Sequence, residues 1–198
     1  MLIKIIIVIS IIAILGTIFF CIIKSKKIKI GNTSSSQEMI ENILSISSYE
    51  SVIEVEVNSN KNVNKYVIKQ TYTPPNISVQ EVLEPENIQG IKITKSENEI
   101  KVENTQLNMT KIYSNYPYMT SNCLDLNTFI ELYKQNGESK YEEKDDEIIL
   151  KTENEQNIYT KYRILYIDKK TGKPTKMEIK DNSKNTSIYI LYKEVKFQ

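Results

Sequence analysis

The stretch IEVEVNSNKN, residues 53–62, indicates the fold class of the chain. Ile53, Val55 and Val57 alternate with two glutamates, and this period of two is typical of a strand with one packed face and one wet face. The polar residues 58–62 that follow are typical of a hairpin turn. The stretch therefore predicts antiparallel β-structure.

Similar alternating or β-branched runs continue toward the C-terminus, separated by short segments that contain proline, glycine or asparagine. We expect further strands at 65–73, 77–83, 91–95, 99–103, 107–112, 139–143, 147–152, 158–167, 175–180 and 186–197. Short strands at this spacing predict a mainly β (α+β) fold, an antiparallel meander of about eleven strands. Because strand twist accumulates across a long sheet, we expect a curved half-barrel.

Two segments have a helical period instead, and each is expected to cover the sheet with one apolar face. Each carries a Ser/Thr-x-x-Glu sequence that is typical of a capping box. The segments and their capping residues are 36–47 with Ser35 and Glu38, and 126–136 with Thr128, Glu131 and the C-cap Gly137.

The segment 5–23 is apolar apart from three residues, and about 19 residues at about 1.5 Å each just span a hydrocarbon core. We therefore divide the chain into a membrane anchor or signal segment with a basic flank, 1–30, and one β domain, 31–198. The lysines between 24 and 29 suit anionic lipid headgroups beside such an anchor.

Cys21 leaves a second interpretation of this segment open, a lipoprotein signal with lipid attached to the cysteine. Lipid attachment normally needs a small residue directly before the cysteine, whereas Phe20 is large. A retained transmembrane helix is therefore favoured. The charges do not decide the orientation, because the lysines after the helix nominally favour a domain on the inner side.

The composition excludes the common catalytic arrangements. Histidine is absent, so Ser-His-acid and Cys-His sites cannot form, and the five glycines form no phosphate-binding loop. Two cysteines, one of them in the anchor, allow neither a disulfide framework nor a paired-thiol metal site in the domain. We expect no enzyme activity, no cofactor and no metal, and we interpret the carboxylate pairs Glu142-Glu143 and Asp145-Asp146 as solvated turn residues.

Charge is distributed unevenly along the chain. The first 30 residues carry five lysines and no acid, which leaves 21 basic against 25 acidic residues, a formal net charge of −4, in the rest. A mildly acidic domain predicts no nucleic-acid surface.

Three tyrosines, Tyr113, Tyr116 and Tyr118, lie with a proline in an irregular segment between a predicted strand and the second helix. Tyrosine is stiff and amphipathic and is favoured in protein interfaces. We predict that these residues lie near a partner surface. The alternative is that their rings fill the open end of the sheet.

Several segments resemble, in their order along the chain, the family of the spore germination lipoprotein GerS and its relatives in spore-forming bacteria. Each segment alone is a weak signal, and together they cover roughly the whole domain. They are 38–47, 59–62, 66–70, Glu84-Pro85-Glu86-Asn87-Ile88-x-Gly90, 126–133, Asp168-Lys169-Lys170-Thr171-Gly172-x-Pro174 and 188–192.

The resemblance implies a fold like that of LolA and LolB, an eleven-stranded open barrel. It also implies a non-enzymatic accessory protein that binds and licenses the cortex peptidoglycan amidase CwlD, an N-acetylmuramoyl-L-alanine amidase, in spore germination. On this basis we expect the domain on the outer side of the membrane. A lipid or lipoprotein carrier is the alternative, and the long strands are compatible with strand exchange in a homodimer.

Overall fold

Alternating side chains pack the chain into a single sheet with two helices against it. The computed structural model describes residues 35–59, 61–96, 99–114, 124–136, 141–155 and 157–197, and these belong to one compact unit. In chain order the elements are α2 (Ser36–Leu44), β1 (Tyr49–Asn58), β2 (Val63–Thr73), β3 (Ile77–Glu84), η1 (Glu86–Ile88), β4 (Ile91–Lys95), β5 (Glu99–Asn104), β6 (Met109–Ser114), α4 (Leu126–Gln135), β7 (Tyr141–Lys144), β8 (Glu147–Glu153), β9 (Tyr162–Asp168), β10 (Pro174–Lys180) and β11 (Thr186–Phe197).

The sheet has eleven strands in the order β6-β5-β4-β3-β2-β1-β11-β10-β9-β8-β7, and every neighbouring pair is antiparallel. The first and last strands meet in the middle, with Tyr49 of β1 opposite Phe197 of β11. The two halves of the meander therefore run outward from this central pair, and β6 and β7 form the two edges.

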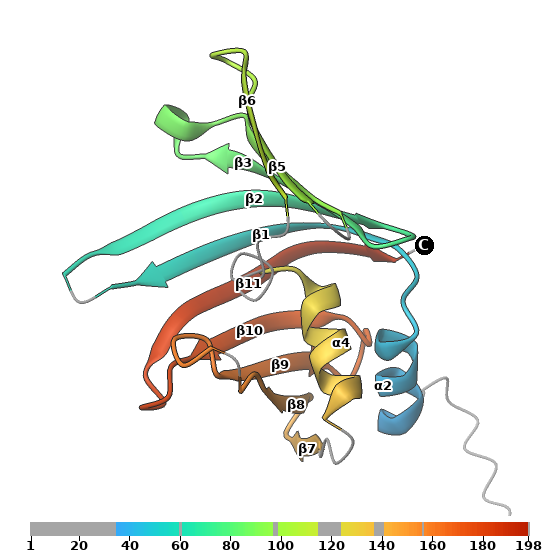
Figure 1. The fold of residues 1–198 in the computed structure, drawn as a ribbon. Helices are drawn as coiled ribbons and strands as arrows, with labels where there is room; N and C mark the ends of the chain where they lie inside the picture. Colours follow the sequence, from blue (N-terminus) through green and yellow to red (C-terminus); the bar gives the residue numbers. More distant parts are fainter. Residues whose placement is uncertain are drawn as a thin grey trace, which may run out of the picture. The chain divides into compact units, whose positions relative to one another are not determined.

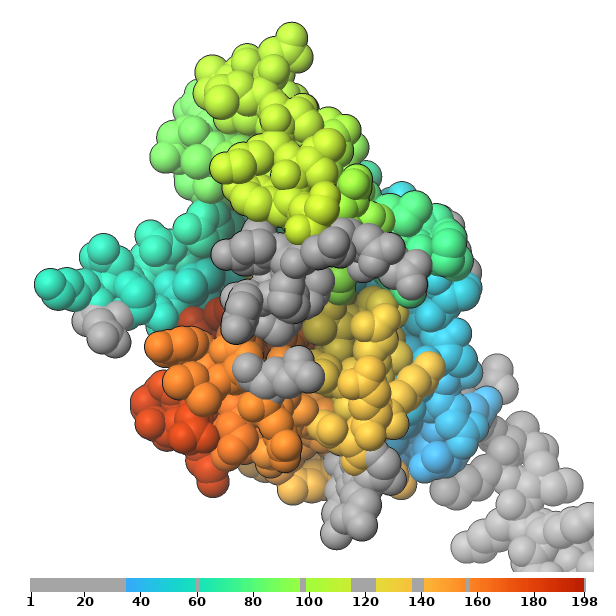
Figure 2. Space-filling view, in the orientation of Figure 1, coloured from blue at the N-terminus to red at the C-terminus, as the bar shows by residue number. Residues whose placement is uncertain are grey.

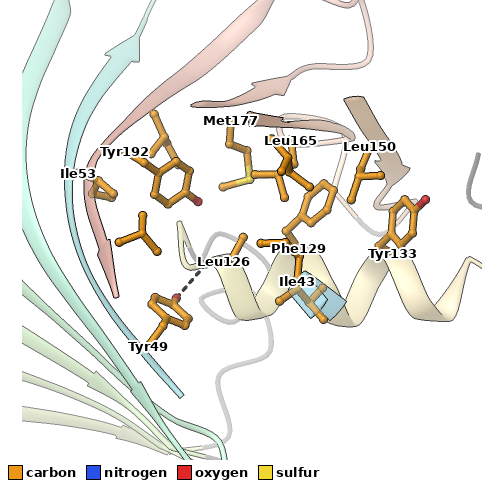
Figure 3. Packing of buried hydrophobic residues seen from close by; sticks show 14 of the residues in the cluster. Ile43, Tyr49, Ile53, Leu126, Phe129, Tyr133, Leu150, Leu165, Met177 and Tyr192 are labelled. Carbon is orange, nitrogen blue, oxygen red and sulfur yellow. Dashed lines mark hydrogen bonds between the residues drawn. The ribbon is translucent and has the colours of Figure 1, made fainter. Parts of the chain in front are cut away.

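Both helices lie on the same side of the curved sheet (Figure 1). Alternate residues of β1, β8, β9, β10 and β11 point toward them and are buried, among them Ile53, Leu165 and Met177. Phe129 of α4 and Ile43 of α2 fill the centre of this cluster (Figure 3). Ile68 and Tyr72 of β2 complete this main core, in which burying each such side chain contributes about 1.5–3 kcal/mol.

The predicted curved, open antiparallel sheet of eleven strands with two helices is confirmed. The predicted cap of the first helix is also confirmed at Ser35, whose hydroxyl oxygen accepts a hydrogen bond from the Glu38 N–H at 3.2 Å. This helix ends at Leu44, three residues before the predicted end, because Ser45 turns the chain toward β1.

Two predicted strands begin too early, and asparagine turns explain both differences. The strand expected at 158–167 begins at Tyr162, because the Asn157 side chain accepts from the Tyr159 N–H at 2.9 Å and holds a turn. The strand expected at 107–112 becomes β6, because the Asn104 side chain accepts from two following N–H groups and Asn108 has a φ of 55°.

The predicted capping box at Thr128 and Glu131 is wrong. Asp125 is the N-cap of α4, and its carboxylate accepts from the Thr128 N–H at 2.7 Å, so Thr128 lies inside the first turn. Aspartate is as good an N-cap as serine, and here it is buried.

The predicted anchor 1–30, with Cys21, lies outside the described residues, as do Tyr116, Tyr118 and Gly137. Within the ranges that the structure describes, no helix has the length and apolar character to cross a membrane.

Replacing Asp125 by alanine should lower the free energy of unfolding by about 2 kcal/mol, because a buried helix N–H loses its acceptor. Urea unfolding of residues 31–198, followed by circular dichroism, measures the change. Ser35→Ala at the exposed cap of α2 is the control and should cost about 1 kcal/mol or less. Equal losses from the two variants would contradict the special role of the buried cap.

Candidate functional site

A buried polar cluster lies at the beginning of α4. Asp125 is 1% exposed, and one of its carboxylate oxygens accepts from both the N–H and the hydroxyl of Thr128, each at 2.7 Å. The Ser78 hydroxyl of β3 approaches the second oxygen at 3.5 Å. These contacts connect the first turn of α4 to the sheet on the side of β3.

Two tyrosines of the central strands belong to the same cluster. The Tyr49 hydroxyl oxygen accepts from the Leu126 N–H at 2.9 Å, and Tyr192 lies near the same turn (Figure 3). Burial raises the pKa of Tyr49, and the negative charge of Asp125 raises it further. Burial also raises the pKa of Tyr192, where the positive charge of the buried Arg163 acts in the opposite direction.

This cluster is enclosed by the core and offers no surface to a substrate. Its side chains are all buried, and the neutral form of both tyrosines is strongly favoured. The arrangement therefore holds the first turn of α4 against β1 and β3.

Of the carboxylate pairs of the sequence, Asp145-Asp146 forms the turn between β7 and β8 as predicted, whereas Glu142-Glu143 lies in the exposed strand β7 and not in the turn. Lys151 pairs with Glu142 at 2.7 Å, and Lys169 pairs with Glu143 at 3.1 Å. A hydrogen bond with Ser36 and the neighbouring Lys169 hold the pKa of Glu143 below its ordinary value. A general acid needs a raised pKa, so Glu143 is unsuited to that role. Among the described residues, no group of three side chains could hold a metal ion.

The convex face of the sheet, opposite the helices, has a hollow of about 320 Å³. Carboxylates surround an apolar floor, and Lys65 pairs with Glu56 at 3.1 Å on its rim. The volume is at the lower limit of ligand pockets and matches one or two side chains. Its lining side chains on this face include Glu54, Glu56, Glu84, Lys65, Val67, Pro85, Tyr189 and Leu191.

Tyr166 lies on the same convex face, next to this hollow along the sheet. Its hydroxyl donates to the Glu178 carboxylate at 3.0 Å, and the Lys176 ammonium lies 4.1 Å from the centre of its ring. Burial and, secondly, this hydrogen bond raise the pKa of Tyr166 to about 12.

The hairpin of β5 and β6 carries three exposed apolar side chains. Leu107, Met109 and Ile112 are 66%, 64% and 54% exposed. The hairpin, yellow-green in Figure 2, projects at the top of the view, away from the helices. Exposed apolar side chains on an edge strand are available to contact a protein partner.

Of the three tyrosines predicted to bind a partner, the structure places only Tyr113, because Tyr116 and Tyr118 lie outside the described residues. Tyr113 is half-buried on β6, and the Lys111 ammonium lies 5.0 Å from the centre of its ring. It therefore lies in the same hairpin as the exposed Leu107, Met109 and Ile112. Nothing in the sequence marks Met109 and Ile112 as exposed, because apolar residues in a predicted strand are usually packed.

The described chain is an open antiparallel sheet of eleven strands with both helices packed on one face. The family model for YdcC-like sporulation proteins matches residues 3–198. The chain therefore belongs to the YdcC-like sporulation protein family.

Several solved structures are similar to the chain. A chain in the structure of the CwlD amidase from Clostridioides difficile in complex with the GerS lipoprotein is 26% identical, with a TM-score of 0.54 over 85% of this chain and 99% of that chain. An uncharacterised conserved protein from Thermus thermophilus is 13% identical, with a TM-score of 0.52 over 83% and 88%. A LolA superfamily protein from Nitrosomonas europaea is 13% identical, with a TM-score of 0.45 over 83% and 94%.

None of the curated proteins matches the chain in sequence. The family match and the complex with GerS confirm the resemblance to the GerS family that the sequence predicted.

In a titration followed by tyrosinate absorbance, the variant Tyr166→Phe should lack one ionisation with a pKa of about 12. Folding raises the pKa of Tyr166 above its unfolded value of about 10. The resulting contribution to the stability of the fold is complete below about pH 10, and it is lost as the pH rises through the pKa of the folded state. Glu178→Gln should lower the ionisation midpoint of Tyr166, because the acceptor loses its charge. If the ionisation that is lost in Tyr166→Phe has the ordinary tyrosine pKa of about 10, the assignment is wrong.

Proposed function

We propose that this protein is a non-enzymatic accessory protein of sporulation and germination that binds and licenses a CwlD-like cortex peptidoglycan amidase. The observation that carries the proposal is the likeness, at 26% identity over 85% of the chain, to a chain in the structure of CwlD with GerS. Membership of the YdcC-like sporulation family supports the same cellular process.

The packing supports a binding role over a carrier role. A carrier would need an apolar cavity for acyl chains on the concave side of its sheet. Here Ile43, Phe129 and their neighbours from α2 and α4 fill the concave side of β1 and β8–β11. The hollow of about 320 Å³ lies on the opposite face and has a charged rim.

The chemistry of the described side chains also supports a non-enzymatic role. The buried Asp125 cluster is closed to substrate, and the exposed Glu142 and Glu143 are paired with lysines. The similar chain in the CwlD–GerS structure is a component of an amidase complex. A partner amidase supplies the catalytic centre in this proposal.

We further propose that residues 5–23 anchor the protein in the membrane and hold the domain on its outer side. The amidase partner acts on peptidoglycan, which lies outside the membrane. The anchor must therefore hold the domain on the outer side if the domain is to bind the amidase. Retention of the helix without lipid on Cys21 follows from the large Phe20 before it.

Purified domain 31–198 should bind the CwlD-like amidase of the same bacterium with a Kd of about 1 μM or lower, as expected for a specific interface. Isothermal titration calorimetry measures the affinity, and release of peptide stems from peptidoglycan measures amidase activity with and without the domain. An amidase of an unrelated family serves as the control. A CwlD-like amidase that neither binds nor changes its activity would contradict the proposed function.

Protease added to intact protoplasts should degrade the domain 31–198 and leave the anchor. A cytoplasmic protein in the same sample should survive as the control. Complete protection of the domain would contradict the proposed orientation. Mass spectrometry of the intact chain distinguishes a retained helix from a form that is cleaved and lipidated at Cys21.

A further inference from the structure

The two edges of the sheet differ in length and charge. The β7 edge, Tyr141–Lys144, has four residues, of which three are charged. The β6 edge, Met109–Ser114, has six residues with Lys111 as its single charge. Natural proteins protect sheet edges with short strands and charged side chains, and only β7 follows this rule.

The backbone of β6 is paired on one side. Among the strands that the structure describes, β6 is hydrogen-bonded to β5 alone, and in an antiparallel pair every second residue points its N–H and C=O away from the partner. An extended segment has the spacing to pair with such an edge. The exposed side chains of Met109 and Ile112 flank this edge on opposite faces and would cover the apolar side chains of an added strand.

The charge near β6 indicates the chemistry of the partner. Residues 91–114 carry four lysines against three glutamates, a net charge of +1, in a domain whose net charge is −4. The strand register places Lys95 and Lys111 on the concave face, and it places no carboxylate there on the described strands β4, β5 and β6. An acidic segment with apolar residues therefore complements this surface.

We propose that the β6 edge is the docking site for the protein partner, through an extended segment rich in acidic and apolar residues that adds a twelfth strand. This inference rests on the proposed function, since the segment belongs to the amidase. Backbone pairing would supply affinity, and Met109, Ile112 and Lys111 would select the sequence of the segment.

Hydrogen–deuterium exchange of the full-length protein in detergent, with and without the CwlD-like amidase, tests the mode of binding. We expect exchange in 107–114 to slow by about tenfold or more in the complex, because the outward N–H groups of β6 gain acceptors. Peptides covering β7 should be unchanged. A complex that forms without added protection of β6 would overturn the inference and leave the proposed function intact.

The double substitution Met109→Lys with Ile112→Lys makes the β6 edge rich in charged side chains, as the β7 edge already is. It should weaken amidase binding about tenfold or more, while the fold is retained because both side chains are exposed. The matched control is Ile158→Lys, at a side chain that is 59% exposed outside this hairpin, and its affinity should stay within about twofold of the wild type. Wild-type affinity in the double variant would overturn the inference.

Two further outcomes identify a different occupant or a different function. If β6 becomes protected in the protein alone as its concentration rises, a second copy occupies the edge, and the proposal of an acidic partner segment is wrong. If neither the wild type nor Ile158→Lys binds the amidase, the proposed function fails, and the docking role of β6 fails with it.

Discussion

The pairing of β1 with β11 is the constraint on which the rest of the structure depends. It joins a six-stranded half and a five-stranded half into one sheet, and both strands contribute alternate side chains to the core. The helices can be buried only once this pair exists, because α4 packs between the side chains of the two halves. Tyr49 then connects the pair to the first turn of α4, because its hydroxyl oxygen accepts from the Leu126 N–H.

Local patterns predicted the elements well, because they depend on side-chain period and capping chemistry that operate over a few residues. Ser35, the alternation at 53–57 and the apolar stripe of α2 are examples. Errors arose where a buried or turn-forming polar residue had equally suitable neighbours. Asp125 and Thr128 can both cap a helix, and only burial against the sheet selects Asp125. Asn157 likewise shortens β9 through a turn that no periodicity marks.

The order of the strands and the exposure of the candidate site could not be predicted in the same way. No local sequence pattern indicates that the first strand pairs with the last. The hydrogen bond from the Asn58 side chain to the Thr186 carbonyl, for example, joins residues that are 128 positions apart. Met109 and Ile112 also look like core residues of an ordinary strand, and they are exposed only because β6 ends the sheet beyond the reach of the helices. The surface is therefore a consequence of topology rather than of composition.

The central position of β11 also has a consequence for biosynthesis. A ribosome completes β1 long before it makes β11. In the growing chain, one edge of β1 is therefore unpaired, and the apolar residues of β1 lack the strands of the second half to pack against. Loss of β11 through an early stop codon would leave two incomplete sheets rather than a slightly shorter protein. The nascent chain therefore cannot complete its sheet until its last described strand has emerged, and its apolar residues stay exposed until then.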